Sequence, residues 1–233
     1  MTDGDARSEV RCTVEAMSSV TAATARVFLD VLLPDDCPGC GAERGPPPTG
    51  FCGSCRELVG LLPLPVAVAS PLRGAWALGE HAGPLGAAVR RAKYRPDPLL
   101  VDALGDALGQ VLVGRTPRVD VVVGVPVHRV RRLRRGFDQG RRLAVRVARA
   151  LGVPEVGVLR RVGRGAQAAR AADARQVALR GAFRAEAPGG RRVLLVDDVC
   201  TTGATARACA TELLGAGAQK VWLATVTHAR GRR

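Results

Sequence analysis

Short apolar runs alternate along the chain with longer stretches in which apolar residues recur at helical spacing. The runs at 120–127 and 193–196 are too short for helices and have the composition of strands buried on both faces of a parallel sheet. A further strand is expected at 221–227, after a Gly-Ala-Gly helix stop at 215–217. The pattern therefore predicts an α/β fold with a parallel sheet flanked by helices.

Four segments between these runs have the pattern of helices. Residues 83–94 predict a short basic helix, and 206–214 a helix directly after the run at 193–196. Residues 99–113 place apolar side chains on one helical face, at positions 100, 101, 104, 108, 111 and 112. Asp138 can cap a fourth helix, which carries Leu143, Val147 and Leu151 on one face.

Two C-x-x-C knuckles lie near the amino terminus, with eleven residues between them. Their thiolates can close a tetrahedron around Zn²⁺, with the ligands Cys37, Cys40, Cys52 and Cys55. With every position filled by protein, such a zinc would be structural. A thioredoxin-like redox pair is the alternative, but it explains one C-x-x-C and not two.

Two adjacent carboxylates, Asp197 and Asp198, directly follow the apolar run at 193–196. Residues 201–205, Thr-Thr-Gly-Ala-Thr, then open a helix and offer hydroxyl groups, backbone N–H groups and the positive end of the helix dipole. Such a loop suits a phosphate, whereas carboxylates suit ribose hydroxyls or water-bound Mg²⁺. The stretch indicates a ribose 5-phosphate site, although an ordinary Asp/Thr turn that caps a helix has the same pattern.

Charge adds a preference for anionic partners. The 233-residue chain has a net charge of +14, and only 3% of its residues are aromatic, which argues against extensive base stacking. Nine arginines and one acid lie between His128 and Arg149. Arginine forks suit a pyrophosphate, but such a run is equally typical of a solvated face.

The first 26 residues lack the pattern of a secretion signal, and the apolar stretch 58–78 is interrupted by prolines and an arginine. We therefore expect no integral membrane segment and a cytoplasmic protein. The expected organisation is a loose extension at 1–26, a zinc-binding module at 27–60, a Pro-rich connector at 61–82, a main domain at 83–229 and a basic tail at 230–233.

Residues 193–205 resemble the phosphoribosyl pyrophosphate signature of type I phosphoribosyltransferases. The knuckles and the motifs at 92–94, 125–128, 135–139 and 180–183 together resemble the ComF family of competence-associated phosphoribosyltransferase-like proteins, over about 27–227. The resemblance implies a type I phosphoribosyltransferase-like sheet with a small amino-terminal four-cysteine zinc module.

The same resemblance implies the roles of individual residues. Asp197 and Asp198 would bind the ribose and Mg²⁺ of phosphoribosyl pyrophosphate. Its 5-phosphate would be held by Cys200, Thr201, Thr202, Gly203, Ala204 and Thr205. A pyrophosphate loop and hood would comprise Val127, His128, Arg129, Arg131, Arg132, Arg135, Gly136, Phe137 and Gln139. Lys93 and Tyr94 are further candidates for ligand contact.

The function expected is binding of Mg-phosphoribosyl pyrophosphate in DNA uptake or natural competence, with or without transfer of the phosphoribosyl group. The alternative is a non-catalytic accessory protein that binds single-stranded DNA through sequence-independent phosphate contacts, together with DNA-uptake or recombination proteins. No catalytic base and no base-recognition pocket can be named from the sequence.

Overall fold

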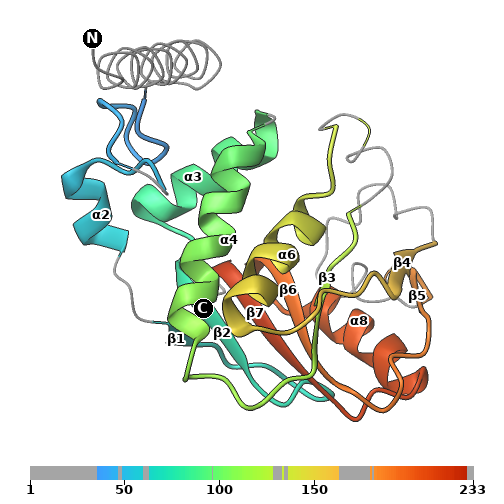
Figure 1. Cartoon of the computed structure of the whole chain (residues 1–233). Coiled ribbons are helices and arrows are strands. Elements are labelled where there is room, and N and C mark those ends of the chain that lie inside the picture. The colour runs from blue at the N-terminus through green and yellow to red at the C-terminus, as the bar shows by residue number, and fades with distance from the viewer. Residues whose placement is uncertain are drawn as a thin grey trace, which may run out of the picture. The chain divides into compact units, whose positions relative to one another are not determined.

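The computed structural model, shown in Figure 1, describes residues 36–46, 49–59, 63–95, 97–127, 133, 136–162, 179 and 181–229. The chain divides into two compact units, Met1–Asp36 and Cys37–Arg233. All helices and strands of the described residues lie in the second unit. In the described residues no helix is long and apolar enough to cross a membrane.

A five-stranded sheet forms the centre of this unit, in the order β1-β2-β7-β6-β3. Its strands are β1 (Leu64–Pro65), β2 (Ala75–Glu80), β3 (Val121–Gly124), β6 (Arg192–Cys200) and β7 (Lys220–His228). Only β1 pairs antiparallel, and the other three pairings are parallel. The parallel sheet predicted from the apolar runs is confirmed. The stretch expected as a Pro-rich connector, 61–82, contributes β1 and β2 to the sheet.

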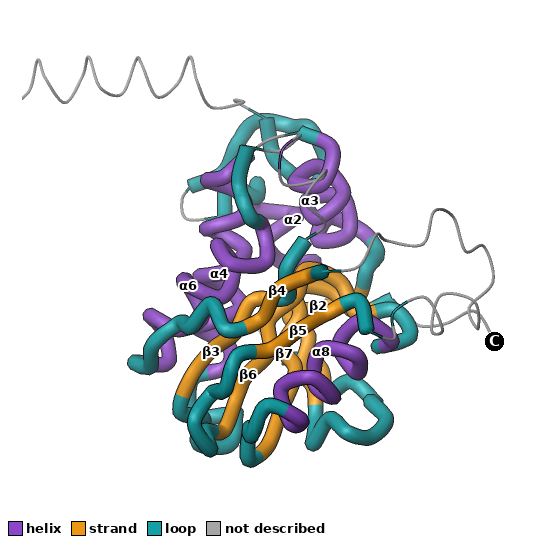
Figure 2. The backbone as a smooth tube through the Cα atoms, turned by 90° about the vertical axis from the view of Figure 1, so that its right-hand side faces the viewer, coloured by secondary structure: helices purple, strands orange, loops and turns teal. Residues whose placement is uncertain are grey.

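Helices cover both faces of the sheet (Figure 1). One face carries α3 (Gly83–Tyr94), α4 (Pro98–Leu112) and α6 (Gln139–Leu151), and the other carries α8 (Ala204–Gly215). Alternation along β6 explains the two layers, because Leu194 and Val196 join one buried cluster while Val193 and Leu195 join the other. Figure 2 shows the remaining elements, α2 (Gly53–Val59) and the antiparallel pair β4 (Leu159–Arg161) and β5 (Phe183–Ala185).

Helices α4 and α6 pack at close range because α4 presents glycine to α6. A Cβ at Gly109 would lie 2.6 Å from the Cβ of Ala150, and one at Gly105 would lie 2.8 Å from that of Arg146. Two ion pairs flank this contact: Arg142 donates to Asp102 at 2.8 and 2.6 Å, and Arg146 donates to Asp106. Part of the arginine run is thus neutralised within the fold.

Gly109→Ala is expected to destabilise the protein. Overpacking costs about 1–3 kcal/mol, and the gain in helix propensity is about 1 kcal/mol, so a net loss should remain. Denaturant unfolding measures it. Gly215→Ala, at a helical glycine with open space around its Cβ, is the control and should leave stability unchanged or raised. Equal stability of the Gly109→Ala variant and the wild type would contradict the close packing.

The ends of β3 and β6 are fixed in different ways. At their amino ends, Arg192 donates to both carboxylate oxygens of Asp120, at 3.0 and 2.7 Å. At the carboxyl end, a Cβ at Gly140 would lie 2.1 Å from the carbonyl oxygen of Val125, so the first turn of α6 sits directly against the chain leaving β3. This close approach brings Gln139, the first residue of α6, to the carboxyl edge of the sheet, where ligands of open α/β sheets bind.

Candidate sugar-phosphate site and metal centre

The four knuckle cysteines converge. Their sulfur atoms all lie within 4.8 Å of one another, and those of Cys40 and Cys52 are 3.7 Å apart. Zinc–sulfur bonds of about 2.3 Å in a tetrahedron place sulfurs roughly 3.8 Å apart, so the cluster has the size of a zinc site. The backbone N–H groups of Gly39 and Cys52 donate to the sulfur of Cys37, each at 3.4 Å. The cluster is therefore compatible with structural zinc.

The protonation of these thiols also fits a metal site. Although burial opposes it, hydrogen bonds from backbone groups, that of Cys52 first, lower the pKa of Cys37 to about 6. Burial raises the pKa of Cys55. Without a cation the four sulfurs would thus not all be thiolates at neutral pH, and a bound metal ion supplies the charge that deprotonates them together.

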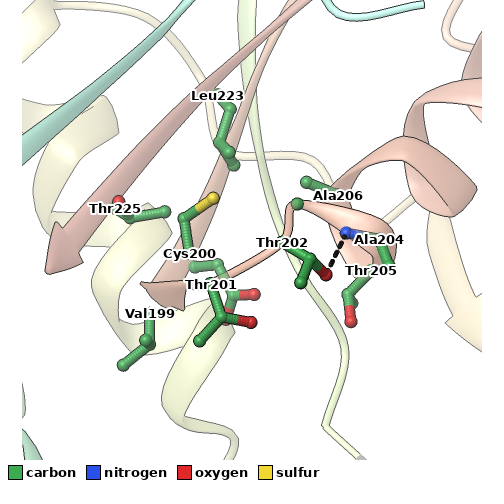
Figure 3. A pocket seen from close by; sticks show the side chains of 11 residues that line it. Val199, Cys200, Thr201, Thr202, Ala204, Thr205, Ala206, Leu223 and Thr225 are labelled. Carbon is green, nitrogen blue, oxygen red and sulfur yellow. Dashed lines mark hydrogen bonds between the residues drawn. The ribbon is translucent and has the colours of Figure 1, made fainter. Parts of the chain in front are cut away.

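The loop after β6 encloses a small hollow at the amino end of α8 (Figure 3). Its volume is about 40 Å³, which is room for about three waters at roughly 10–15 Å³ each. The lining residues are Asp197, Val199, Cys200, Thr201, Thr202, Gly203, Ala204, Thr205, Ala206, Leu223 and Thr225. The stretch predicted to wrap a phosphate therefore lies around one cavity. A helix amino end supplies free N–H groups and positive dipole there.

Local geometry shapes this loop. Gly203 has a φ of +70°, which only glycine adopts readily, and it directly precedes the first residue of α8. Ala204 N donates to the hydroxyl of Thr202 at 3.4 Å (Figure 3), and the guanidinium of Arg207 donates to the carbonyl of Thr202 at 2.9 Å. Behind the loop, the hydroxyl of Thr225 is buried and has no hydrogen-bond partner in the described part of the chain.

Strand β6 continues to Cys200, so both acids lie within it rather than after its end. Asp197 lines the hollow, and its Oδ1 accepts from the backbone N–H of Asp198 at 2.8 Å. Burial, followed by the charge of Asp198, raises the pKa of Asp197 to about 8. Burial likewise raises the pKa of Cys200, so this residue is a thiol with no nucleophilic character at neutral pH.

The raised pKa of Asp197 predicts a pH-dependent stability. An unfolded aspartate has a pKa of about 3.9, so between about pH 4 and 8 the folded state binds the extra proton and stability falls as pH rises. In Mg²⁺-free buffer, the free energy of unfolding of Asp197→Asn relative to that of the wild type should rise by at least about 1 kcal/mol from pH 5 to pH 8. This corresponds to a relative rise of roughly 2–4 °C in Tm. Thermal melts at both pH values measure this gain, and a constant difference between the two proteins would contradict it.

Asp198 faces the opposite helix layer, where two side chains hold it. Its Oδ2 lies 3.4 Å from the Nζ of Lys93 and accepts from the Nε2 of Gln139 at 3.2 Å. Lys93 is in the last turn of α3 and Gln139 is the first residue of α6, so two helices fix one carboxylate. The structure thus brings four residues predicted from the sequence together at the carboxyl edge of the sheet: Lys93, Gln139, Asp197 and Asp198.

His81 and Thr227 belong to the same edge, and sequence reasoning missed them. The Nδ1 of His81 lies 2.9 Å from the hydroxyl of Thr227, which donates to the carbonyl of Asp198 at 3.4 Å. Burial, then the charges of Lys93 and Arg90, lowers the pKa of His81. The two residues are 146 positions apart. Nothing in the sequence pairs them. They meet because β2 pairs with β7 and His81 directly follows the last residue of β2.

The expected pyrophosphate loop and hood are described in part. Val127, Gly136 and Phe137 lie between β3 and α6, and Gln139 is the first residue of α6; Gly136 has a φ of +75°. The others, His128, Arg129, Arg131, Arg132 and Arg135, lie outside the described residues. Tyr94 is 84% exposed, whereas Lys93 before it lies 3.4 Å from Asp198.

Comparison with known proteins agrees with this architecture. A sequence model of the phosphoribosyl transferase domain matches residues 138–233. The DNA utilization protein YhgH of Salmonella typhi is 34% identical over 196 residues, which is 80% of this chain and 82% of that protein. The protein of the same name from Escherichia coli (strain K12) is 32% identical over 198 residues, with the same coverage of 80% and 82%.

Among solved structures, the glutamine phosphoribosylpyrophosphate amidotransferase from B. subtilis, complexed with ADP and GMP, matches with 27% identity and a TM-score of 0.39, over 55% of this chain and 26% of that one. The α/β phosphoribosyltransferase-like fold with a small four-cysteine module, predicted from the sequence, is confirmed. By its identity to relatives over four-fifths of its length, the chain belongs to the family of the DNA utilization proteins YhgH.

Proposed function

We propose that the protein binds Mg-phosphoribosyl pyrophosphate at the carboxyl edge of the sheet, with the 5-phosphate of the ligand in the hollow between β6 and α8. The arrangement that carries the proposal is the pairing of a Thr/Gly-rich loop at a helix amino end with two acids at the edge of the same strand. The loop 201–205 would hold the 5-phosphate through backbone N–H and hydroxyl groups.

In this proposal the two acids differ in role. Asp198, oriented by Lys93 and Gln139, accepts the ribose hydroxyls. Asp197 stays protonated near neutral pH, so it can donate to a ligand oxygen. Bound Mg²⁺ would neutralise the pyrophosphate and draw charge from it as it leaves. Residues 127–139 would contact that pyrophosphate and close over it, which makes positioning and electrostatic stabilisation the source of any rate enhancement.

We place the protein in the ComF group of competence-associated proteins, acting in DNA uptake in the cytoplasm with other uptake or recombination proteins. The motifs quoted above support this placement, and so does the printed name of the relatives, DNA utilization protein. The domain boundaries at residues 27 and 230 and the structural role of zinc belong to the same proposal, with β1 and β2 counted in the main domain because they are part of its sheet.

Calorimetric titration of Mg-phosphoribosyl pyrophosphate into the zinc-loaded protein tests the proposal, with pyrophosphate release followed in the same sample. Saturable binding is expected. Release stimulated by a nucleobase or another acceptor would make the protein a transferase, and binding without release would make it a sensor or carrier of the sugar. Absence of binding at millimolar ligand would refute the proposal.

A second candidate, binding of single-stranded DNA without turnover, has support from the net charge of +14 and from the name of the relatives. Among the described residues of the basic run, however, three arginines are engaged in ion pairs: Arg141, Arg142 and Arg146. The candidate therefore depends on residues such as Arg131 and Arg132. A steep loss of affinity with salt, reduced in an Arg131→Ala/Arg132→Ala variant, would favour it.

A further inference from the structure

The cysteine module packs directly onto the first turn of α3. A Cβ at Gly39, between two of the cysteines, would lie 2.7 Å from the Cβ of Pro84 and 3.0 Å from the sulfur of Cys55. The module's buried residues share one apolar cluster with α3: Cys37, Phe51 and Cys55 with Leu85, Ala88, Val89 and Ala92. The module and α3 therefore form one packed body, in which the module supports the amino end of α3.

The other end of α3 reaches the acids. Helix α3 has 12 residues, which spans roughly 18 Å at 1.5 Å per residue, and its last turn carries Lys93. The ammonium of Lys93 lies 3.4 Å from Asp198 Oδ2, and the side chain is only 28% exposed. A helix transmits a displacement of one end to the other, since its own hydrogen bonds keep it stiff. The position of the module thus bears on the orientation of Asp198.

The second holder of Asp198 does not depend on the module. Gln139 belongs to α6, which packs on α4 and against the end of β3. Release of α3 would therefore weaken the orientation of Asp198 without abolishing it. A graded effect on affinity follows, rather than an all-or-none one.

We propose that Lys93 is a positioning residue through which the metal-bound cysteine module sets the affinity of the sugar-phosphate site. The proposal rests on the function proposed above, because affinity for the sugar pyrophosphate is its first measure. The module then has a role beyond local stability. Loss of its metal ion, by chelation or thiol oxidation, would lower ligand affinity from about one helix length away.

The test compares zinc removal in the wild type and in Lys93→Met. Mg-phosphoribosyl pyrophosphate is titrated into each full-length protein before and after treatment with a zinc chelator. In the wild type the affinity should fall about tenfold, because this is the contribution of one charge-assisted hydrogen bond to binding. Lys93→Met should start about tenfold weaker and change little on zinc removal. An equal fall in both proteins would overturn the proposal, as would no fall in the wild type.

Lys220→Met is the matched control, because Lys220 is an exposed lysine at the start of β7. It should behave as the wild type in both states. A second pair changes the packing at the module: Gly39→Ala places a methyl group 2.7 Å from the Cβ of Pro84 and 3.0 Å from the sulfur of Cys55, whereas Gly53→Ala places one in open space. With zinc content equal to that of the wild type, only Gly39→Ala should weaken binding.

Amide hydrogen exchange separates this inference from the proposed function, since it needs no ligand. On zinc removal, exchange should quicken in α3 (Gly83–Tyr94) and stay unchanged in α8 (Ala204–Gly215), which packs on the other face of the sheet. If the wild type binds no sugar pyrophosphate, the proposed function is wrong. Amide exchange in α3 still shows in that case whether the cysteine module is coupled to this helix. Unchanged exchange in α3, or equal loss of protection in both helices, would overturn the inference.

Discussion

The double variant Asp197→Asn/Asp198→Asn is expected to lose measurable binding of Mg-phosphoribosyl pyrophosphate while it keeps the native fold. The ionised Asp198 makes a charge-assisted hydrogen bond, which contributes about 1.5–3 kcal/mol, and the protonated Asp197 makes a neutral one of about 0.5–1.5 kcal/mol, so loss of both should weaken binding by roughly 30- to 2,000-fold. The fold should persist because an asparagine oxygen can still accept from the backbone N–H of residue 198 and from Gln139. Calorimetry gives the affinity, and circular dichroism and thermal melting give the fold.

Asp120→Asn is a matched control for this variant. Asp120 is also an acid and directly precedes β3, but it bonds Arg192 at the opposite, amino end of the sheet. Its substitution should lower stability and leave ligand affinity unchanged. Retained binding by the double variant would remove the acids from the site, and an unfolded double variant would make them structural.

Much of the fold could be predicted because its signals are local. The apolar run at 193–196 identifies β6, and Asp138 caps α6 as expected, with Oδ1 accepting from the N–H of Arg141 at 3.1 Å. The helix at 83–94 has the predicted bounds. Strand β2 escaped prediction because Pro63, Pro65 and Pro71 dominate the stretch before it, while its own six residues, Ala75–Glu80, contain no proline.

The candidate site could be predicted only where its residues are neighbours in sequence. The acids and the loop 201–205 are contiguous, and their cavity follows from a strand that leads into a helix. The contact of Asp198 with Lys93 joins a strand to a helix, and that of His81 with Thr227 joins the ends of two adjacent strands that are far apart in sequence. Likewise, the arginine run could not be divided into ligand-facing and structural members, because the partners Asp102 and Asp106 lie 40 residues away.

Substitution of a single knuckle cysteine tests the metal centre. Cys40→Ser is expected to reduce bound zinc from about one per chain to near none, because one of four ligands is lost. The fall in zinc affinity should exceed the roughly 10–100-fold that loss of a supporting residue costs at metal sites. Cys40 is the exposed member of the cluster, so a serine there leaves no cavity in the core.

Zinc analysis of the purified protein, together with thermal melting, measures the effect. The melting temperature should fall with the zinc, because a short Pro- and Gly-rich module buries too little apolar surface to hold its fold without the metal. Cys209→Ser separates the two effects, because Cys209 is a buried thiol of α8 outside the cluster. That variant should lose stability and keep its zinc. Stoichiometric zinc in Cys40→Ser would instead show that three sulfurs suffice, and the site would then have an open position for an exchangeable ligand rather than a closed structural role.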